Sequence, residues 1–323
     1  MPKITYKQRS RQMKPDWQEV IAQANSIIEE YVDKGYDLTI RQLYYQFISR
    51  DVFPEDWFDS QVGSFNSQRN YKRLVDVIGE GRLCGLVDWT YLVDRTRNLQ
   101  TLDHWDGPED ILHDAARWFN QDLWDEQQVR VEVWIEKDAL LGLIQNVCSS
   151  NDVPYFSCRG YTSLSEMWTS GQRIVQRLKN KDQGTTILHL GDHDPSGVDM
   201  SRDIEDRLLT FLSKHVTEQQ AESFEVKRIA LTYEQVQTYN PPPNPVKQSD
   251  TRWQAYVDKL GLEECWELDA LGPDQLTTLI QDNISSLRDA DLWNKGLERE
   301  NRVREQIETV ADKWFEIEEY LDI

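Results

Sequence analysis

The chain has 323 residues, a length that accommodates two domains of ordinary size. Its formal net charge of −21 argues against a protein that coats nucleic acid with a basic surface, although a local basic segment can still bind DNA in a salt-dependent way. No apolar run approaches the roughly 20 residues that cross a bilayer, and no signal peptide is recognisable, so we expect a cytoplasmic protein without a membrane partner.

The amino-terminal residues are basic. Residues 1–14 contain five Lys and Arg side chains and no acid, which indicates an arm that contacts DNA or, alternatively, a solvated tail. Residues 15–34 follow, with apolar side chains at helical spacing until Gly35. This pattern predicts an amphipathic helix.

The next predicted helix begins with a capping box formed by Thr39 and Gln42. Its apolar face consists of Ile40, Leu43, Tyr44, Phe47 and Ile48. Arg41 and Tyr45 are four residues apart, so they share a second face away from these side chains. A neighbouring guanidinium favours the ionised form of a phenol and can also bind a phosphate oxygen. The alternative is a surface tyrosine that packs over its neighbours.

Residues 67–78 predict a third helix, which we expect Gly79-Glu80-Gly81 to end. Arg69, Lys72 and Arg73 would project outward from this helix. The β-rich run 85–93 is consistent with a hairpin. Helices followed by a hairpin suggest a winged-helix domain, in which a basic helix enters a DNA groove, although a helical bundle with one hairpin gives a similar pattern.

Apolar runs at 129–135, 153–158 and 185–190 alternate with helical stretches and predict a parallel sheet. Glu136 follows the first run, and Asp192 and Asp194 follow the third. Ligands of parallel sheets collect beyond the carboxyl ends of the strands. Three carboxylates gathered there would repel one another unless a divalent cation neutralised them, so we predict a site for Mg²⁺, with Mn²⁺ as an alternative. The competing interpretation is a set of solvated or helix-capping acids.

Three segments, in this order along the chain, carry a resemblance to a known family: Arg41-Gln42-Leu43-Tyr44-Tyr45, Ile135-Glu136-Lys137 and Leu190-Gly191-Asp192-His193-Asp194-Pro195-Ser196-Gly197. They resemble the A subunit of topoisomerase VI and its meiotic relative that makes double-strand breaks, and most of all the short stand-alone "mini-A" type. Arg159-Gly160-Tyr161 falls where the family has a glycine turn. Gln42 departs from the pattern, because the family has an acid there.

The resemblance implies an α/β fold with an α+β amino-terminal part. Residues 1–105 would form the basic arm and a winged-helix domain, 106–127 a linker with a helix, and 128–323 a TOPRIM metal-binding domain with carboxy-terminal helices. We expect these helices to cover the sheet or to mediate assembly. Residues 266–271 are similar to a family feature, to which we assign only structural support.

The implied activity is Mg²⁺-dependent cleavage of double-stranded DNA. Tyr45 would be the nucleophile that becomes linked to a 5′ phosphate, supported by Arg41, while Glu136, Asp192 and Asp194 hold the metal. Candidate DNA contacts are Arg69, Lys72, Arg73, Lys137 and Arg159, with His193 as a further phosphate contact. In the family the tyrosine and the metal of one site come from different subunits, which implies a homodimer. The chain has no nucleotide-binding P-loop, so any ATPase would be a separate partner.

Three alternatives remain open. A TOPRIM hydrolase could cut DNA or RNA with a metal-activated water and without Tyr45. A phosphotransfer protein could be phosphorylated on Asp192, although the upstream glutamate and the Pro-x-Gly after Asp194 argue against it. A winged-helix protein could bind DNA without cleaving it.

Overall fold

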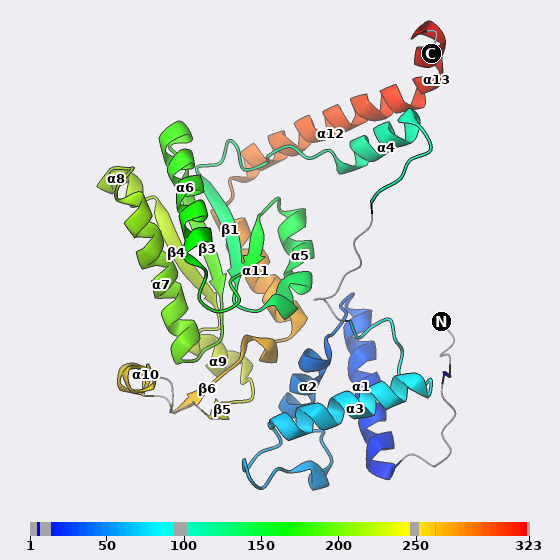
Figure 1. Ribbon diagram of the computed structural model, residues 1–323, viewed down its shortest axis with the longest axis vertical. Helices are drawn as coiled ribbons and strands as arrows, with labels where there is room; N and C mark the ends of the chain where they lie inside the picture. Colours follow the sequence, from blue (N-terminus) through cyan, green and yellow to red (C-terminus); the bar gives the residue numbers. More distant parts are fainter. Residues whose placement is uncertain (1–4, 7–13, 94–101, 246–251, 262, 322–323) are drawn as a thin grey trace.

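The computed structural model describes residues 5–6, 14–93, 102–245, 252–261 and 263–321, and most of the basic arm lies outside them. The protein is a mixed α/β structure with a central four-stranded parallel sheet (Figure 1). Helices cover both faces of this sheet, and a second group of helices from the amino-terminal part of the chain lies beside one of its edges. None of the described helices is long and apolar enough to span a membrane.

The amino-terminal group comprises α1 (Pro15–Asp33), α2 (Ile40–Ser49), the short η1 (Glu55–Trp57) and α3 (Gln68–Leu83). The predicted capping box is confirmed, since the Gln42 amide donates to Thr39 Oγ1 at 3.2 Å and the Thr39 amide donates to Gln42 Oε1 at 2.9 Å. The three helices enclose a core of their own, which also includes Ala270 from the distant carboxy-terminal part of the chain.

Two local predictions for this group are wrong. The third helix does not end at residues 79–81 but continues to Leu83. A Cβ on Gly81 would lie only 3.0 Å from side-chain atoms of Ile21 and Val87, so the glycine serves close packing inside a helix. Residues 85–93 do not form a hairpin; they run irregularly, and one isolated bridge joins Leu92 to Leu38.

The sheet consists of β1 (Val129–Ile135), β2 (Tyr155–Ser157), β3 (Gly184–Leu190) and β4 (Phe224–Ala230), in the order β2-β1-β3-β4. All neighbouring strands are parallel, which confirms the predicted β-α-β-α-β order. The second strand is shorter than the predicted 153–158, and β4 was not predicted. Because β1 and β3 are adjacent and parallel, the residues that follow them meet at the carboxyl ends of the two strands, which we call the sheet edge.

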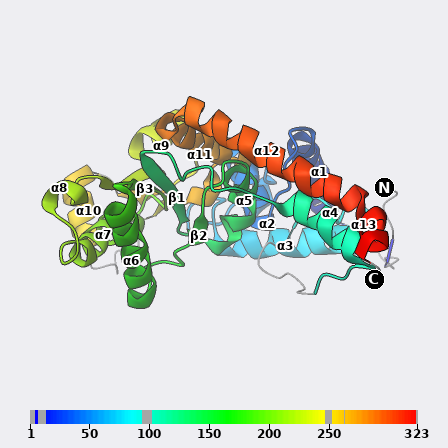
Figure 2. The same cartoon turned by 90° about the horizontal axis from the view of Figure 1, so that it is seen from above.

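The sheet is the middle of three layers (Figure 2). Trp134 and Ile187 pack with α6 (Leu164–Lys181) and α7 (Pro195–Leu212) on one face. Val133 and Leu188 pack with α5 (Leu141–Ser150) and α11 (Pro273–Leu287) on the other. Both faces are therefore buried, as expected for a parallel sheet. The coverage by α11 agrees with the expectation that carboxy-terminal helices cover the sheet.

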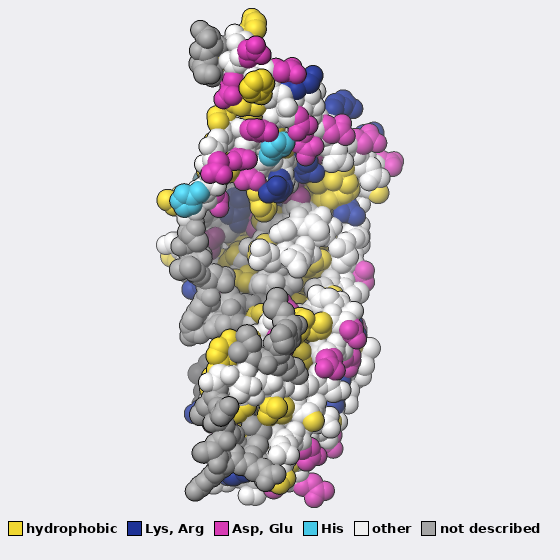
Figure 3. Space-filling view, turned by 90° about the vertical axis from the view of Figure 1, so that its right-hand side faces the viewer, with side chains coloured by type: hydrophobic (Ala, Val, Ile, Leu, Met, Phe, Trp, Pro, Cys, Tyr) yellow, Lys and Arg dark blue, Asp and Glu magenta, His cyan; other side chains and the backbone are white. Residues whose placement is uncertain are grey.

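The remaining elements form an arm and several short helices and strands, most of which lie near the carboxyl ends of the sheet strands, whereas α8 (Glu218–Ala221) lies at their amino ends (Figure 1). In the arm, α4 (Pro108–Trp118) packs along α12 (Ala290–Asp312), which is followed by α13 (Trp314–Leu321), and the arm projects from the body (Figure 1). Many acidic side chains gather on it (Figure 3). The small elements are η2 (Asp138–Leu140), α8, α9 (Tyr233–Tyr239), β5 (Asn244–Pro245), α10 (Trp253–Leu260), β6 (Glu264–Cys265) and η3 (Leu268–Ala270).

Candidate functional site

Two of the three predicted carboxylate residues are in direct contact at the sheet edge. The Glu136 amide extends the pairing of β1 with β3 by donating to the carbonyl of Leu190 at 2.8 Å. The Glu136 side chain then accepts a hydrogen bond from the Asp192 amide, with 2.9 Å between Oε2 and N. The prediction that residues following β1 and β3 would meet is therefore confirmed for Glu136 and Asp192.

Asp194 lies at the start of α7 and caps it. Its Oδ1 accepts a hydrogen bond from the amide of Gly197 at 2.6 Å, and Pro195 occupies the first turn, where a missing amide hydrogen has no cost. A Cβ on Gly197 would lie 2.2 Å from the carbonyl oxygen of Asp192. Only glycine therefore lets the helix begin this close to the carboxylates.

The electrostatics of these side chains match those of a cation site. Burial, and then repulsion from Asp192 and Asp194, raise the pKa of Glu136 to about 7. Burial also raises the pKa of Asp192. Mg²⁺ prefers oxygen ligands, and its charge would stabilise the ionised carboxylates that repel one another here, so the residues fit this ion in kind.

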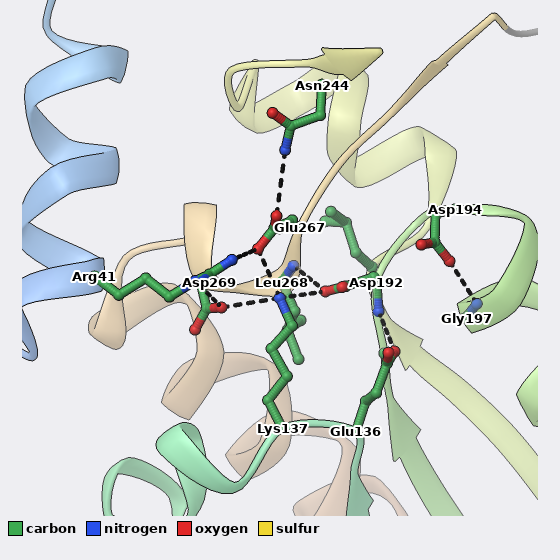
Figure 4. A network of polar contacts seen from close by, with 12 residues as sticks. Arg41, Glu136, Lys137, Asp192, Asp194, Gly197, Asn244, Glu267, Leu268 and Asp269 are labelled. Atoms are coloured by element: carbon green, nitrogen blue, oxygen red, sulfur yellow. Dashed lines mark hydrogen bonds and ion pairs between the residues drawn. The ribbon is translucent and has the colours of Figure 1, made fainter. Parts of the chain in front are cut away.

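The carboxylates do not point toward a common position that a cation could occupy. The Asp192 carboxylate points toward Lys137 and Leu268, whereas that of Asp194 points toward Gly197 (Figure 4). Within the described ranges, no group of three acidic, His or Cys side chains is arranged to hold a metal ion as the side chains stand. The metal site stays a prediction that requires side-chain rotation.

Lys137 is the counter-ion of the carboxylates. Its Nζ lies 2.9 Å from Asp192 Oδ1, 3.0 Å from Glu267 Oε2 and 2.9 Å from Asp269 Oδ2 (Figure 4). Burial opposes the charge of Lys137, but the three acids raise its pKa well above the ordinary range. The predicted phosphate-binding lysine is thus enclosed by acids instead of being free on the surface.

Arg41 reaches the same acids from α2. Its Nε donates to Asp269 Oδ2 at 3.1 Å, and a terminal nitrogen pairs with Glu267. Burial alone would raise the pKa of Glu267, but Lys137 and Arg41 lower it to about 2. The Asp269 side chain is 1% exposed, and its Oδ1 has no hydrogen-bond partner among the residues that the structure describes. Asp269 therefore joins α2 to the end of β1 through two cations.

Glu267 and Asp269 were missed as site residues, because the sequence assigned only structural support to their segment. Both come from the chain around η3, far along the sequence from Arg41 and Lys137. A signal was present in the Glu-x-Asp spacing, which repeats the two-residue spacing of Asp192 and Asp194.

Tyr45 does not lie on the surface. Its side chain is 3% exposed and belongs to the core of the amino-terminal helices, with the guanidinium of Arg41 5.9 Å from its ring centroid. Burial and the charge of Glu267 raise its pKa, and the opposing effects of Arg41 and Lys137 do not compensate. Arg41 thus lowers the pKa of this phenol as expected, but burial outweighs its effect, so that the phenol is harder to ionise than a free one.

Two adjoining cavities connect Tyr45 with the acids. One, of about 490 Å³, is lined by Asp192, Asp194 and Lys137, and the other, of about 380 Å³, is lined by Tyr44, Tyr45 and Tyr71. Six residues line both: Arg41, Asn66, Ser67, Gln68, Asn244 and Glu267. The side chains predicted from two distant segments thus border a hollow made of two cavities that share part of their walls.

The other predicted DNA contacts lie outside these cavities. Arg69 and Lys72 are exposed on α3 as predicted. Arg73 does not project into solvent as predicted, because its guanidinium pairs with Asp16 at 2.9 Å and stacks on Trp57. Arg159 is 76% exposed and pairs with Asp138 at 2.6 Å. Consecutive positive φ angles, 51° at Arg159 and 85° at Gly160, form the predicted glycine turn.

Two further residues shape the loop that carries the acids. Arg228 of β4 was not predicted; it donates to the carbonyl of Gly191 at 2.9 Å, of Asp192 at 2.6 Å and of Gly197 at 2.7 Å. Burial lowers its pKa to about 10, so it stays charged at neutral pH. His193 was predicted to contact phosphate but is buried beside Tyr256 and Trp266, and burial lowers its pKa to about 4. It is therefore a neutral packing residue.

No protein-family model matches this sequence, and no curated protein is significantly similar to it. The functional argument therefore depends on the residues and their geometry.

Proposed function

We propose that the protein is a Mg²⁺-dependent enzyme that cleaves strands of double-stranded DNA at a site similar to that of topoisomerase VI A proteins, either through Tyr45 or through water. The amino-terminal helices would be a winged-helix-type DNA-binding unit without a hairpin wing, and the parallel sheet a TOPRIM domain. The observation that carries the proposal is the contact of Glu136 with Asp192. Asp192 and Asp194 line a cavity that shares Arg41 with the cavity lined by Tyr45.

Glu136, Asp192 and Asp194 would hold the ion. When bound, Mg²⁺ supplies positive charge for a phosphodiester and for its leaving oxygen. Arg41 is positioned to donate to phosphate oxygens, because its side chain is 41% exposed and lines both cavities. Lys137 supplies a second charge within 2.9 Å of Asp192. Arg228 fixes the backbone of the acid-bearing loop, which keeps the carboxylates in place.

Tyr45 offers one route to strand cleavage. Its phenol oxygen would attack phosphorus, the bond to the 3′ oxygen would break, and a 5′-phosphotyrosyl link would remain. A second candidate is hydrolysis by water at the same carboxylates. The burial of Tyr45 and its raised pKa favour this second candidate for the structure as it stands, because a neutral and covered phenol is a weak nucleophile.

We propose a homodimer on the duplex, because cutting both strands takes two sites. Apolar side chains remain exposed on the projecting arm, and they suit an assembly surface: Ile111, Trp118, Val310, Phe315 and Tyr320. The acidic character of the same arm disfavours DNA contact there (Figure 3). A cytoplasmic location and an ATPase partner for strand passage belong to the same proposal but are not needed for cleavage.

The test is incubation of supercoiled plasmid with the protein and Mg²⁺. We expect nicked and linear products, lost with EDTA and lost in Asp192→Asn. Asp152→Asn is the matched control, because Asp152 is a partly buried aspartate at the far end of α5 that accepts the Leu123 amide. Intact plasmid with the wild-type protein, but normal DNA binding, would favour the non-catalytic alternative.

The Tyr45→Phe variant separates the two routes. Loss of cleavage, together with loss of DNA covalently bound to wild-type protein after denaturation, supports the tyrosine route. Unchanged cleavage leaves hydrolysis. Tyr31→Phe serves as the control, since Tyr31 is another buried phenol of the same helical group that lines neither cavity.

A further inference from the structure

Two acid-bearing segments are joined by backbone hydrogen bonds at the sheet edge. The amide of His193 donates to the carbonyl of Trp266 at 2.8 Å, and the amide of Trp266 donates to the carbonyl of His193 at 3.0 Å. This bridge brings the Leu268 amide to 2.7 Å from Asp192 Oδ1. The acidic segment around Leu268 is therefore held beside Asp192 by contacts that involve no metal ion.

Lys137 lies between these two segments and is shared by their carboxylates. Its Nζ is 2.9 Å from Asp192 Oδ1 on one side, and 3.0 Å from Glu267 Oε2 and 2.9 Å from Asp269 Oδ2 on the other (Figure 4). An ammonium group has three hydrogens to donate, so these three acceptors take up its whole donor capacity. The charge of one lysine is thus divided between a predicted metal ligand and two acids that are not predicted ligands.

The rotation that a metal ion requires at Asp192 conflicts with these contacts. Asp192 Oδ1 accepts from both Lys137 and Leu268, and the carboxylate points toward these two donors (Figure 4). Turning the carboxylate toward an ion shared with Glu136 breaks its contact with the ammonium group. A divalent cation bound at this distance from Lys137 would also repel its charge. The ion and the lysine therefore compete for Asp192.

We infer that Lys137 is a built-in counter-ion that Mg²⁺ displaces from Asp192, and that Glu267 and Asp269 retain the lysine when the ion binds. This inference rests on the metal site of the proposed function, but on neither route of strand cleavage. Without the ion, Lys137 offsets a carboxylate that would otherwise be buried and unpaired. With the ion bound, the lysine keeps two of its three acceptors. Neither Asp192 nor Lys137 is then left without an opposite charge in either state.

Arg41 offers a matched comparison within the same cluster. Its guanidinium contacts Glu267 and Asp269, as Lys137 does, whereas Lys137 contacts Asp192 as well. Removing either positive charge makes the site more attractive to a cation through the general field. Only the removal of Lys137 also frees Asp192 for the ion, so the two substitutions should differ in their effect on metal affinity.

Binding of Mn²⁺ alone, without DNA and without cleavage, tests the inference. Protein is titrated into Mn²⁺, the free ion is followed by electron paramagnetic resonance, and Mg²⁺ is then added as a competitor. We expect Lys137→Met to bind Mn²⁺ at least about tenfold more tightly than wild type, and Arg41→Met to gain clearly less. Lys137→Arg keeps the charge and should stay close to wild type, which separates the loss of charge from altered packing.

A double-mutant cycle tests the role of the acceptors. Glu267→Gln is used because the Glu267 side chain is 25% exposed, against 1% for Asp269, so that the substitution disturbs the core less. With one acceptor weakened, Lys137 should hold Asp192 more firmly and the affinity for Mn²⁺ should fall. In the Lys137→Met background the fall should be smaller, because only the loss of a negative charge remains. Equal effects in both backgrounds would overturn the inferred transfer.

The remaining outcomes separate this inference from the proposed function. Weaker Mn²⁺ binding by a folded Lys137→Met chain than by wild type would show that the lysine positions Asp192 for the ion, which contradicts displacement. Circular dichroism checks folding, and Lys137→Gln is the second neutral variant. Equal affinities of Lys137→Met and Arg41→Met, with binding lost in Asp192→Asn, contradict displacement and leave the metal site intact. Absence of Mn²⁺ binding in every chain contradicts the metal site itself.

Discussion

Replacing Glu136 by glutamine should make the metal-free protein more stable at alkaline pH. Burial beside Asp192 and Asp194 raises the pKa of Glu136 from the ordinary 4.5 to about 7. One pKa unit corresponds to about 1.4 kcal/mol, so the ionised carboxylate costs the folded state about 3 kcal/mol. Glutamine removes this cost, and its carbonyl oxygen can still accept the Asp192 amide.

The sign of the effect follows from the direction of the shift. Because the folded-state pKa lies above the unfolded one, the cost is absent below pH 4.5, grows as the pH rises to about 7 and is constant above that. Urea unfolding in EDTA should therefore show Glu136→Gln about 3 kcal/mol more stable than wild type at pH 8, but within about 1 kcal/mol of it at pH 5.

Added Mg²⁺ provides the complementary measurement. It should stabilise the wild-type protein at pH 8 and should have little effect on Glu136→Gln. The control is Glu225→Gln, because Glu225 is exposed on β4 and should show no pH-dependent difference. A Glu136→Gln protein that is less stable than wild type at pH 8 in EDTA would refute the claim that these carboxylates repel one another.

Two further substitutions test the packing around the site and in the helical group. Arg228→Gln should lower the free energy of unfolding by about 3 kcal/mol and reduce plasmid cleavage, because three backbone carbonyls around Asp192 lose a buried charged donor. Urea unfolding and the plasmid assay check this. In α3, Gly79→Ala should stabilise by about 0.5–1 kcal/mol, since its Cβ would meet nothing, whereas Gly81→Ala should gain less or destabilise because its Cβ would press against Ile21. Equal thermal shifts for both alanine variants would contradict the second prediction.

The strands that carry the acids were predictable because each is a short apolar run buried on both faces. β1 and β3 lie in the middle of the sheet, where this pattern is strongest. β4 was missed because it is an edge strand whose polar residues, Glu225, Lys227 and Arg228, interrupt the pattern. The run 85–93 was wrongly predicted to form a hairpin, since Val87 and Leu92 are buried by packing onto helices, and the run makes only an isolated bridge to Leu38.

The site itself was only partly predictable from sequence. Glu136 and Asp192 could be placed together because parallel strands fix where their ends meet. The contacts of Arg41 with Glu267 and Asp269 span more than 220 residues of sequence and depend on how α2 packs against η3, which no local pattern encodes. The burial of Tyr45 has the same origin. The sequence correctly places Tyr45 on the same helix face as Arg41, but residues of other segments, Ala270 among them, form the core that buries it.

The charge balance of the hollow explains how an acidic protein could still act on DNA. At or beside its walls, Asp192, Glu267 and Asp269 already pair with Arg41 and Lys137. Nearby, Arg228 is already held by backbone carbonyls, including that of Asp192. A phosphate entering this hollow brings further negative charge, which the occupied cations cannot offset. Phosphate binding at the site must therefore bring in a divalent cation, release Lys137 from Asp192, or both. DNA affinity should consequently rise steeply when Mg²⁺ is added. Ordinary salt at the same ionic strength should instead weaken DNA binding by screening.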